Sequence, residues 1–310
     1  MSLRFTVLAS GSAGNASLVE AGGFGVLLDA GIGPRILAQR LAAVEASWNH
    51  IHALLLTHTH SDHWKETTLV HIARRSIPIY CHEDHHDYLS SGSIAFARLA
   101  EAGLVRLFEA SEEIQLSPGL RCRPIPVRHD SGATFGFRFD GVPDLFGHAS
   151  ALAYLADLGC WDDGLADAVA DVDLLALEFN HDVEMERCSG RMPQLIARVL
   201  GEEGHLSNEQ AVALVREVLR RSTPGRLQYL VQLHLSRECN RPALAQAAAR
   251  AALGRLTSSG KVVTASHDRP SCTFHLGGTA MRRAKVSSHR RSGRAAAASA
   301  QQFLPGVELA

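Results

Sequence analysis

The sequence predicts an α+β fold in which two β-sheets form the middle of the molecule and helices cover their outer faces. Three observations lead to this prediction. Short apolar and β-branched runs bounded by Gly, Asn or Asp recur between residues 4 and 265, as is typical of strands. Runs with apolar residues at helical spacing interrupt them. The early strands follow one another as in hairpins, whereas the later ones are mixed with helices.

The predicted strands share a short run of Val, Leu, Ile, Phe or Ala that ends at a polar or turn-forming residue. The first five belong to the hairpin-like part of the chain, and the others belong to the mixed part. In chain order they cover residues 4–9, 16–19, 25–28, 53–57, 77–81, 120–127, 134–139, 152–156, 173–178, 228–233 and 261–265.

The predicted helices are recognised by apolar residues that recur every three or four positions. Pro34 and Pro193 stand where the first turn of a helix tolerates proline, and Ser207 is placed to cap the helix that follows it. The helices cover residues 34–44, 93–102, 193–202, 208–221 and 241–253.

Composition excludes several classes of protein. Of the 310 residues, 46% are apolar and 20% are charged, and the net charge is −1, which argues against a collagenous, fully disordered or supercharged chain. No apolar run approaches the roughly 20 residues of a membrane-spanning helix, and the first 15 residues lack a signal-peptide pattern. The six cysteines are dispersed without a C-x-x-C pair, which favours reduced thiols. We therefore expect a cytoplasmic protein without a membrane partner.

Charge divides the chain into two predicted regions. Residues 279–310 carry six Lys or Arg and one acid, a balance of +5, and removing that from the total of −1 leaves −6 for the rest. This end is rich in Ser and Ala and has no apolar periodicity, so we predict a folded domain over 1–278 and a basic disordered tail over 279–310. The tail either keeps the protein soluble or attracts phosphate backbones.

Histidine is frequent, at 17 residues, and one cluster of histidines has the spacing of metal ligands. The strand predicted over 53–57 leads directly into His58, His60, Asp62 and His63. Side chains alternate along an extended segment, so the first two face the same side and can hold one ion. A turn after them would direct Asp62 and His63 toward a second ion. Core packing does not explain four such polar groups at the end of a buried strand.

This run resembles the H-x-H-x-D-H signature of the metallo-β-lactamase fold, an αββα four-layer sandwich with a one- or two-metal site at one edge. Further ligands of that family then have candidates, each just past a predicted strand. The resemblance implies one metal on His58, His60 and His129, a second on Asp62, His63 and His234, and Asp157 as the bridge between them.

Four further segments, 8–15, 177–182, 204–208 and 234–240, are similar to the YycJ (WalJ) branch of this fold, which implies a 5′-to-3′ DNA exonuclease. Glu178 and the Gly204-His-Leu-Ser motif also resemble ribonuclease Z, which implies that His205 gives a proton to the leaving group while Glu178 orients it. Ala156 departs from the branch, where Thr often precedes the bridging Asp.

The chemistry of the ligands is compatible with this resemblance. A set of nitrogen and oxygen ligands suits zinc, which we favour, and also manganese or iron. Two such ions would support hydrolysis of a phosphodiester, with nucleic acid as the expected substrate. We predict Asp62, Glu178 and His205 as catalytic residues, and departure of a sugar oxygen calls for a proton donor such as His205.

Other readings stay open from the sequence. The Gly-rich loop at 10–15 is expected near the metals, with Ser12 or Asn15 touching substrate, and His181 is a third candidate for substrate binding. The run 81–87 is expected to open an acidic helical turn facing water. The alternatives to a nuclease are a small-molecule hydrolase of a cyclic phosphodiester, thioester or lactone, and a non-catalytic binding module. The sequence does not indicate an oligomeric state.

Overall fold

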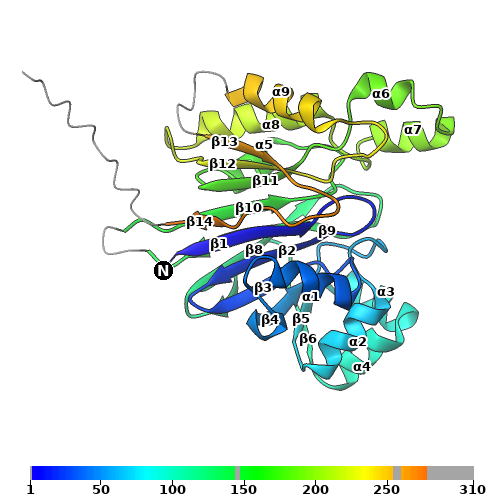
Figure 1. Ribbon diagram of the computed structural model, residues 1–310, viewed down its shortest axis with the longest axis vertical. Coiled ribbons are helices and arrows are strands. Elements are labelled where there is room, and N and C mark those ends of the chain that lie inside the picture. Colours follow the sequence, from blue (N-terminus) through cyan, green and yellow to red (C-terminus); the bar gives the residue numbers. More distant parts are fainter. Residues whose placement is uncertain (1, 144–146, 254–259, 278–310) are drawn as a thin grey trace, which may run out of the picture. The chain divides into compact units, whose positions relative to one another are not determined.

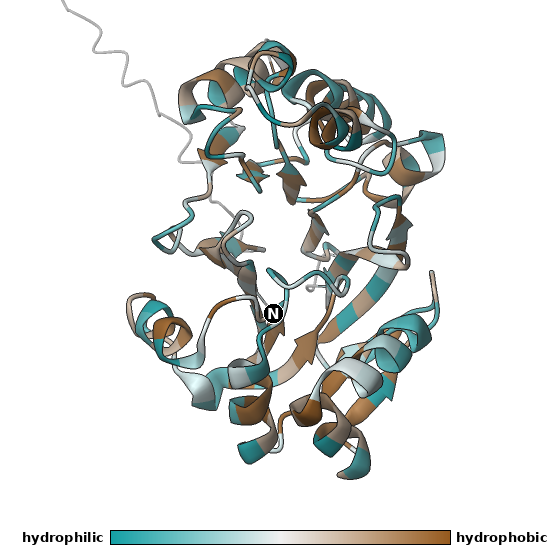
Figure 2. Ribbon diagram, turned by 90° about the vertical axis from the view of Figure 1, so that its right-hand side faces the viewer, coloured by the Kyte–Doolittle hydropathy of each residue, from teal (hydrophilic) through white to brown (hydrophobic). Residues whose placement is uncertain are grey.

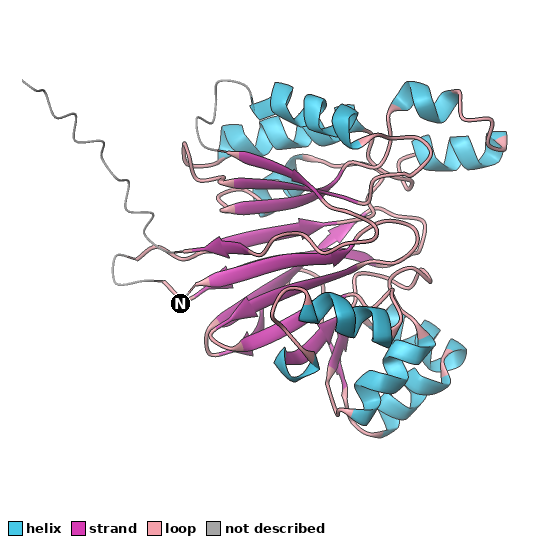
Figure 3. Ribbon diagram, viewed as in Figure 1, coloured by secondary structure: helices cyan, strands magenta, loops and turns pink. Residues whose placement is uncertain are grey.

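Two β-sheets lie between two layers of helices in the computed structural model, which describes residues 2–143, 147–253 and 260–277 (Figure 3). Each sheet has seven strands within these ranges. The predicted four-layer αββα sandwich is confirmed. All the predicted strands and helices overlap observed ones, with ends that differ by a few residues.

The first sheet is antiparallel on one side and parallel on the other. Helices α1 (Pro34–Ala42), α2 (Glu66–Arg74), α3 (Glu83–Gly92) and α4 (Ile94–Glu101) cover its outer face, and a 3-10 turn, η1 (Trp48–His50), leads into it (Figure 1). Its strands, in spatial order, are β14 (Phe274–Leu276), β1 (Leu3–Ala9), β2 (Ala16–Ala21), β3 (Phe24–Leu28), β4 (Ile51–Leu55), β5 (Ile79–Cys81) and β6 (Val105–Leu107).

The second sheet has the same mixed character. Its helical layer consists of α5 (Asp163–Ala168), α6 (Val183–Arg187), α7 (Pro193–Leu200), α8 (Asn208–Arg221) and α9 (Pro242–Leu253) (Figure 1). Its strands, in spatial order, are β13 (Lys261–Thr264), β12 (Tyr229–Leu233), β11 (Leu174–Glu178), β10 (Ala151–Leu155), β9 (Thr134–Gly141), β8 (Leu120–Val127) and β7 (Ile114–Ser117).

Strand β10 shows why the sheets are buried on both faces. Leu152 and Tyr154 point into the core between the sheets, whereas Ala153 and Leu155 point into the core under α5, α8 and α9. Successive side chains of a strand face opposite sides, so a continuous apolar run satisfies both cores. Figure 2 shows hydrophobic stretches on the strands and on parts of the helices, with hydrophilic stretches on the remaining parts of the helices.

Several short elements were missing from the sequence prediction. Strands β6, β7 and β14 have three or four residues each, too few for a clear pattern, and α2, α5 and α6 were also missed. The run 81–87 does open a helix, α3, but the expectation that it faces water was wrong for His85, which is 2% exposed. Residues 279–310 lie outside the described residues, so the predicted tail stays a prediction.

Among the described helices, none is both long and apolar enough to cross a bilayer.

Candidate metal centre

The predicted metal ligands meet at one edge of the sandwich, and those of the second sheet do so because they follow strands that run in the same direction. Strand β8 is antiparallel to β9, and β9 is antiparallel to β10, so β8 and β10 are parallel, as are β10, β11 and β12. Their carboxyl ends therefore point to the same edge. The residues that the structure brings together there are His58, His60, Asp62 and His63 after β4, His129 after β8, Asp157 after β10 and His234 after β12.

Among the described residues, four overlapping groups of side chains at this edge have ligand atoms within 4.8 Å of one another. One of these is Asp157, Glu178, His205 and His234, and two others, of three members each, share no residue. One of these two has three histidines, and the other has two histidines and a carboxylate. They contain the same residues as the two ligand sets that the family resemblance implies. These two groups are His58, His60 and His129, and Asp62, His63 and His234.

Asp157 lies between the two groups. One of its oxygens, Oδ2, is 2.9 Å from Nε2 of His63, and the other, Oδ1, is 2.9 Å from Nδ1 of His234. Ligand atoms of Asp157, His58 and His63 also lie within 4.8 Å of one another. A carboxylate in this position can serve ions on both sides, as expected of a bridge.

The donor atoms fit divalent metal ions. Nε2 of His58 and Nε2 of His234 are buried without a hydrogen-bond partner, which is costly unless something binds them. Burial, helped by the neighbouring His63, lowers the pKa of His58 well below its usual value, so this imidazole is neutral. Neutral imidazole is the form that binds metal. Seven nitrogen and oxygen donors suit zinc, manganese or iron.

Asp29, at the end of β3, orients one of the ligands and was missed by the sequence analysis. Its Oδ2 lies 2.7 Å from Nδ1 of His63, and it also accepts hydrogen bonds from Thr57. Burial opposes protonation of His63, but the carboxylates of Asp29 and Asp157 outweigh burial and raise its pKa to about 10. Because Asp29 holds Nδ1, Nε2 is the ring atom of His63 directed at the candidate metal site. The strand-end rule used for the other ligands, applied to β3, would have found it.

The loop at 10–15 contacts the candidate ligands through Asn15. Nδ2 of Asn15 is 2.9 Å from Nε2 of His63 and 3.2 Å from Oδ2 of Asp62. Asn15 is 1% exposed, so the structure places it among the ligands and away from the surface, whereas Ser12 lines the open pocket. A Cβ on Gly31 would lie 1.7 Å from the carbonyl oxygen of Asp62, so only glycine fits there.

Three residues of the site leave their strands with left-handed backbone, at φ values of 59° for Asp29, 57° for Asp157 and 52° for His234. This conformation is uncommon for residues other than glycine and costs of order 1–3 kcal/mol when it is held by the surroundings. Its recurrence at three strand ends indicates that the fold stabilises the direction of these side chains.

His205 and Glu178 form a pair beside the ligands. Nδ1 of His205 is 2.8 Å from Oε1 of Glu178, and that oxygen is also 2.9 Å from Nδ1 of His234. Burial opposes protonation of His205, but the Glu178 carboxylate outweighs it and raises the pKa of the imidazole. Because Glu178 occupies Nδ1, Nε2 is the ring atom left to act on a substrate.

An open pocket of about 370 Å³ gives access to this centre. His181 is 1% exposed and is not among the lining residues, so the structure does not bring this predicted substrate-binding residue to the pocket wall.

Two arginines of the wall were not indicated by any pattern in the sequence. Arg191 precedes α7, and Arg198, within α7, contacts Asp130. The wall also includes Ser12, His60, Asp62, Asp157, His205 and His234.

Comparisons with known proteins agree with this geometry. A family model described as Beta-lactamase superfamily domain matches residues 25–224. Exodeoxyribonuclease WalJ of Streptococcus pneumoniae serotype 2 is 28% identical over 244 residues, covering 76% of this chain and 83% of WalJ. A ribonuclease Z of Mycolicibacterium gilvum is 47% identical over 68 residues, which cover 20% of this chain and 23% of that protein. The metallo-β-lactamase fold protein YhfI from Bacillus subtilis has a TM-score of 0.61 at 15% identity, covering 89% of this chain and all of YhfI, which shows a shared fold.

Proposed function

This chain belongs to the metallo-β-lactamase superfamily, and we propose that it is a dinuclear metal-dependent phosphodiesterase that degrades DNA from an end. The observation that carries the proposal is the pairing of two adjacent ligand groups with the His205–Glu178 pair in one open pocket. The ligands supply sites for two ions, and His205 supplies a proton donor on the same pocket wall.

The ligand groups define what each part of the site would do. His58, His60 and His129 would hold one ion, and Asp62, His63 and His234 would hold the other, with Asp157 shared. Two divalent ions, zinc in our proposal, would activate water and neutralise negative charge on a phosphate.

His205 is the proposed general acid. Glu178 holds Nδ1 of its ring at 2.8 Å, which fixes the orientation of the imidazole and leaves Nε2 for the oxygen of the leaving group. Glu178 is completely buried and also accepts hydrogen bonds from the main-chain N–H groups of Leu158 and Leu206. With its carboxylate held by these bonds, His205 would present the same ring atom to every substrate.

A phosphodiester substrate is supported by two arginines in the pocket wall, Arg191 and Arg198, because arginine binds phosphate through several hydrogen bonds at once. Each is paired with carboxylates in the free protein, Arg191 with Glu186 and Glu238 and Arg198 with Asp130. DNA as the polymer is supported by the relative WalJ, which is an exodeoxyribonuclease and matches over most of both chains.

The test is degradation of end-labelled single-stranded and double-stranded DNA and of RNA, with added zinc or manganese, by wild type and Asp62→Ala. We expect metal-dependent shortening of DNA from the 5′ end by wild type and none by the variant. Turnover of bis-p-nitrophenyl phosphate measures hydrolysis of a small diester separately. Hydrolysis of thioester or lactone substrates without any cleavage of DNA would contradict the proposal and favour a small-molecule hydrolase.

The role of His205 has its own test. We expect His205→Ala to lower kcat by roughly 10²–10⁴-fold, because proton transfer to the leaving group is lost. Metal content, measured by mass spectrometry of the purified protein, should stay that of wild type, because His205 is outside the two groups proposed to hold the ions and belongs to a separate group with Asp157, Glu178 and His234. An equal loss of metal and of activity would contradict the assignment.

A further inference from the structure

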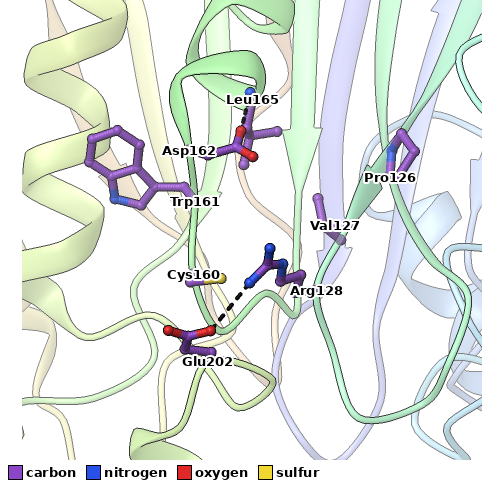
Figure 4. Close-up of a pocket in the computed structure, with 8 residues that line it drawn as sticks. All are labelled: Pro126, Val127, Arg128, Cys160, Trp161, Asp162, Leu165 and Glu202. Atoms are coloured by element: carbon purple, nitrogen blue, oxygen red, sulfur yellow. Dashed lines mark hydrogen bonds and ion pairs between the residues drawn. The ribbon is translucent and has the colours of Figure 1, made fainter.

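A second cavity, of about 360 Å³, lies beyond the metal centre between the end of β8 and the loop before α5. Figure 4 shows Trp161 and Asp162 on one side, Pro126 and Val127 on the other, and the ion pair of Arg128 with Glu202 at one end. Its volume is within the roughly 300–1,000 Å³ of ligand sites. The metal chemistry described above uses none of these residues.

This cavity is connected to the metal pocket through a third hollow. Arg198 lines both the metal pocket and the third hollow. Arg128 and Glu202 line both the third hollow and the cavity at Trp161. Because they share lining residues, the three hollows lie next to one another, with an arginine at each junction, and together they are called the track below. A single mononucleotide would not need a track of this kind, whereas a polymer would.

The side chains along the track suit a single strand of nucleic acid. Such strands are bound by cationic groups that follow the backbone and by aromatic rings on which bases stack. Trp161 is partly exposed, and its Nε1 donates a hydrogen bond to the main-chain oxygen of Gln210 at 3.0 Å, which holds the ring in place. Leu165 and Val127 add apolar walls.

We infer that the track binds a single strand of DNA, with backbone phosphates at Arg198 and Arg128 and a base against Trp161. The inference rests on the proposed function, since it assigns the path of that substrate away from the metals. It names Trp161 and Arg128 as residues that select a polymer over a small phosphodiester.

The third hollow also holds carboxylates, Asp130, Glu202 and Glu203, beside its two arginines. The side chains of Arg128 and Glu202 are 66% and 79% exposed, so their ion pair is weak and a phosphate can replace Glu202, which can then turn toward water. Asp130 is only 23% exposed and contacts Arg198 through Nε, so the terminal nitrogens of that guanidinium are the atoms offered to a phosphate.

The test is binding of fluorescein-labelled phosphorothioate oligothymidylates of 2, 4 and 8 nucleotides to the metal-loaded protein, measured by anisotropy. These probes resist hydrolysis, so binding is read without turnover. We expect affinity to increase with length for wild type, and Trp161→Ala to lose about 5- to 150-fold of affinity for the 8-mer, the value of one stacked base. Arg128→Ala should weaken binding of the 8-mer and reduce its dependence on salt.

The matched control is Arg220→Ala. Arg220 is an exposed arginine, 68% exposed and paired with Glu217, but it is on α8 and lines none of the three hollows. We expect this variant to bind every probe as wild type does. Trp161→Phe keeps an aromatic ring and should retain most of the affinity. This comparison shows whether Trp161→Ala binds weakly because base stacking is lost or because the protein is misfolded.

The outcomes separate the inference from the proposed function. If wild type degrades DNA while Trp161→Ala and Arg128→Ala bind the 8-mer as tightly as wild type, the inferred binding track is wrong and the proposed nuclease activity is supported. If wild type fails to degrade DNA although its affinity increases with probe length and this increase depends on Trp161, the proposed nuclease activity is wrong and the binding track is supported. Affinity that is independent of length overturns the track.

Discussion

Two runs of the chain hold three histidines each but have different surroundings. Residues 58–63 follow β4 and contain one acid, and residues 82–87 follow β5, the parallel neighbour of β4, and contain three acids. In the first run the ring nitrogens face ligands from other strands, and Nε2 of His58 has no partner. Among the described residues, no group with metal-ligand geometry includes a member of the second run.

Two histidines of the second run are instead bound by main-chain groups. Nδ1 of His82 accepts the N–H of Asp84 at 3.2 Å and caps α3, and His85 lies 2.8 Å from the carbonyl oxygen of Ala133 through Nε2. The density of histidines therefore does not define a metal centre. A centre forms where ring nitrogens stay unpaired and donors from several strands converge on them.

The largest effect that tests this comparison is expected from Asp157→Asn. The substitution keeps the shape of the bridging residue but removes its charge, which serves both ligand groups. We expect metal content to drop and turnover of bis-p-nitrophenyl phosphate to fall by more than about 100-fold. Loss of a residue that only contacts a metal ligand costs up to about 100-fold, and loss of a ligand itself should cost more.

Asp84→Asn is the matched control in the second run. The side chain of Asp84 is 69% exposed and belongs to no ligand group. Metal content and turnover should both equal those of wild type. If the two variants lose metal to the same extent, the distinction between the two runs is wrong.

The second effect is a pH dependence of stability from His85. Burial, and to a smaller extent the charge of His82, lowers its pKa from 6.5 to about 4, although the Ala133 carbonyl and Asp84 oppose this shift. Above pH 6.5 the ring is neutral in both the folded and unfolded states. As pH falls from 6.5 to 4, the unfolded state binds a proton that the folded state resists, so the free energy of unfolding decreases by about 3 kcal/mol.

His85→Gln should remove this dependence, because glutamine can still donate to the Ala133 carbonyl but does not titrate. The measurement is urea unfolding of wild type and variant at several pH values with chelator present. The difference between the two proteins should change across pH 4 to 6.5 and be constant above it. A constant difference throughout would show that the His85 ring is protonated as easily in the fold as outside it.

The sequence predicted the sandwich and the ligands because each depends on a local pattern. Continuous apolar runs identify the buried strands, and a polar residue directly after such a run, as at His58 or His234, identifies the edge where ligands meet. Residues whose role depends on neighbours distant in sequence could not be found this way. Arg198 belongs to the pocket wall only because α7 packs beside His60, and His85 is buried only because the loop at Ala133 contacts it.

The smallest effect is expected from Asp29→Asn, which tests whether a residue that touches only a ligand contributes to the metal centre. Asparagine keeps the size of the side chain and can still bond Thr57, but it no longer holds Nδ1 of His63 with a full charge. We expect metal affinity, measured by competition with a chelator, to fall by about 10- to 100-fold. Asp173→Asn is the control, since Asp173 is a buried carboxylate at the start of β11, the end of that strand opposite Glu178. That variant should lose stability and keep its metal affinity, so an equal loss of affinity in both would reduce Asp29 to a structural residue.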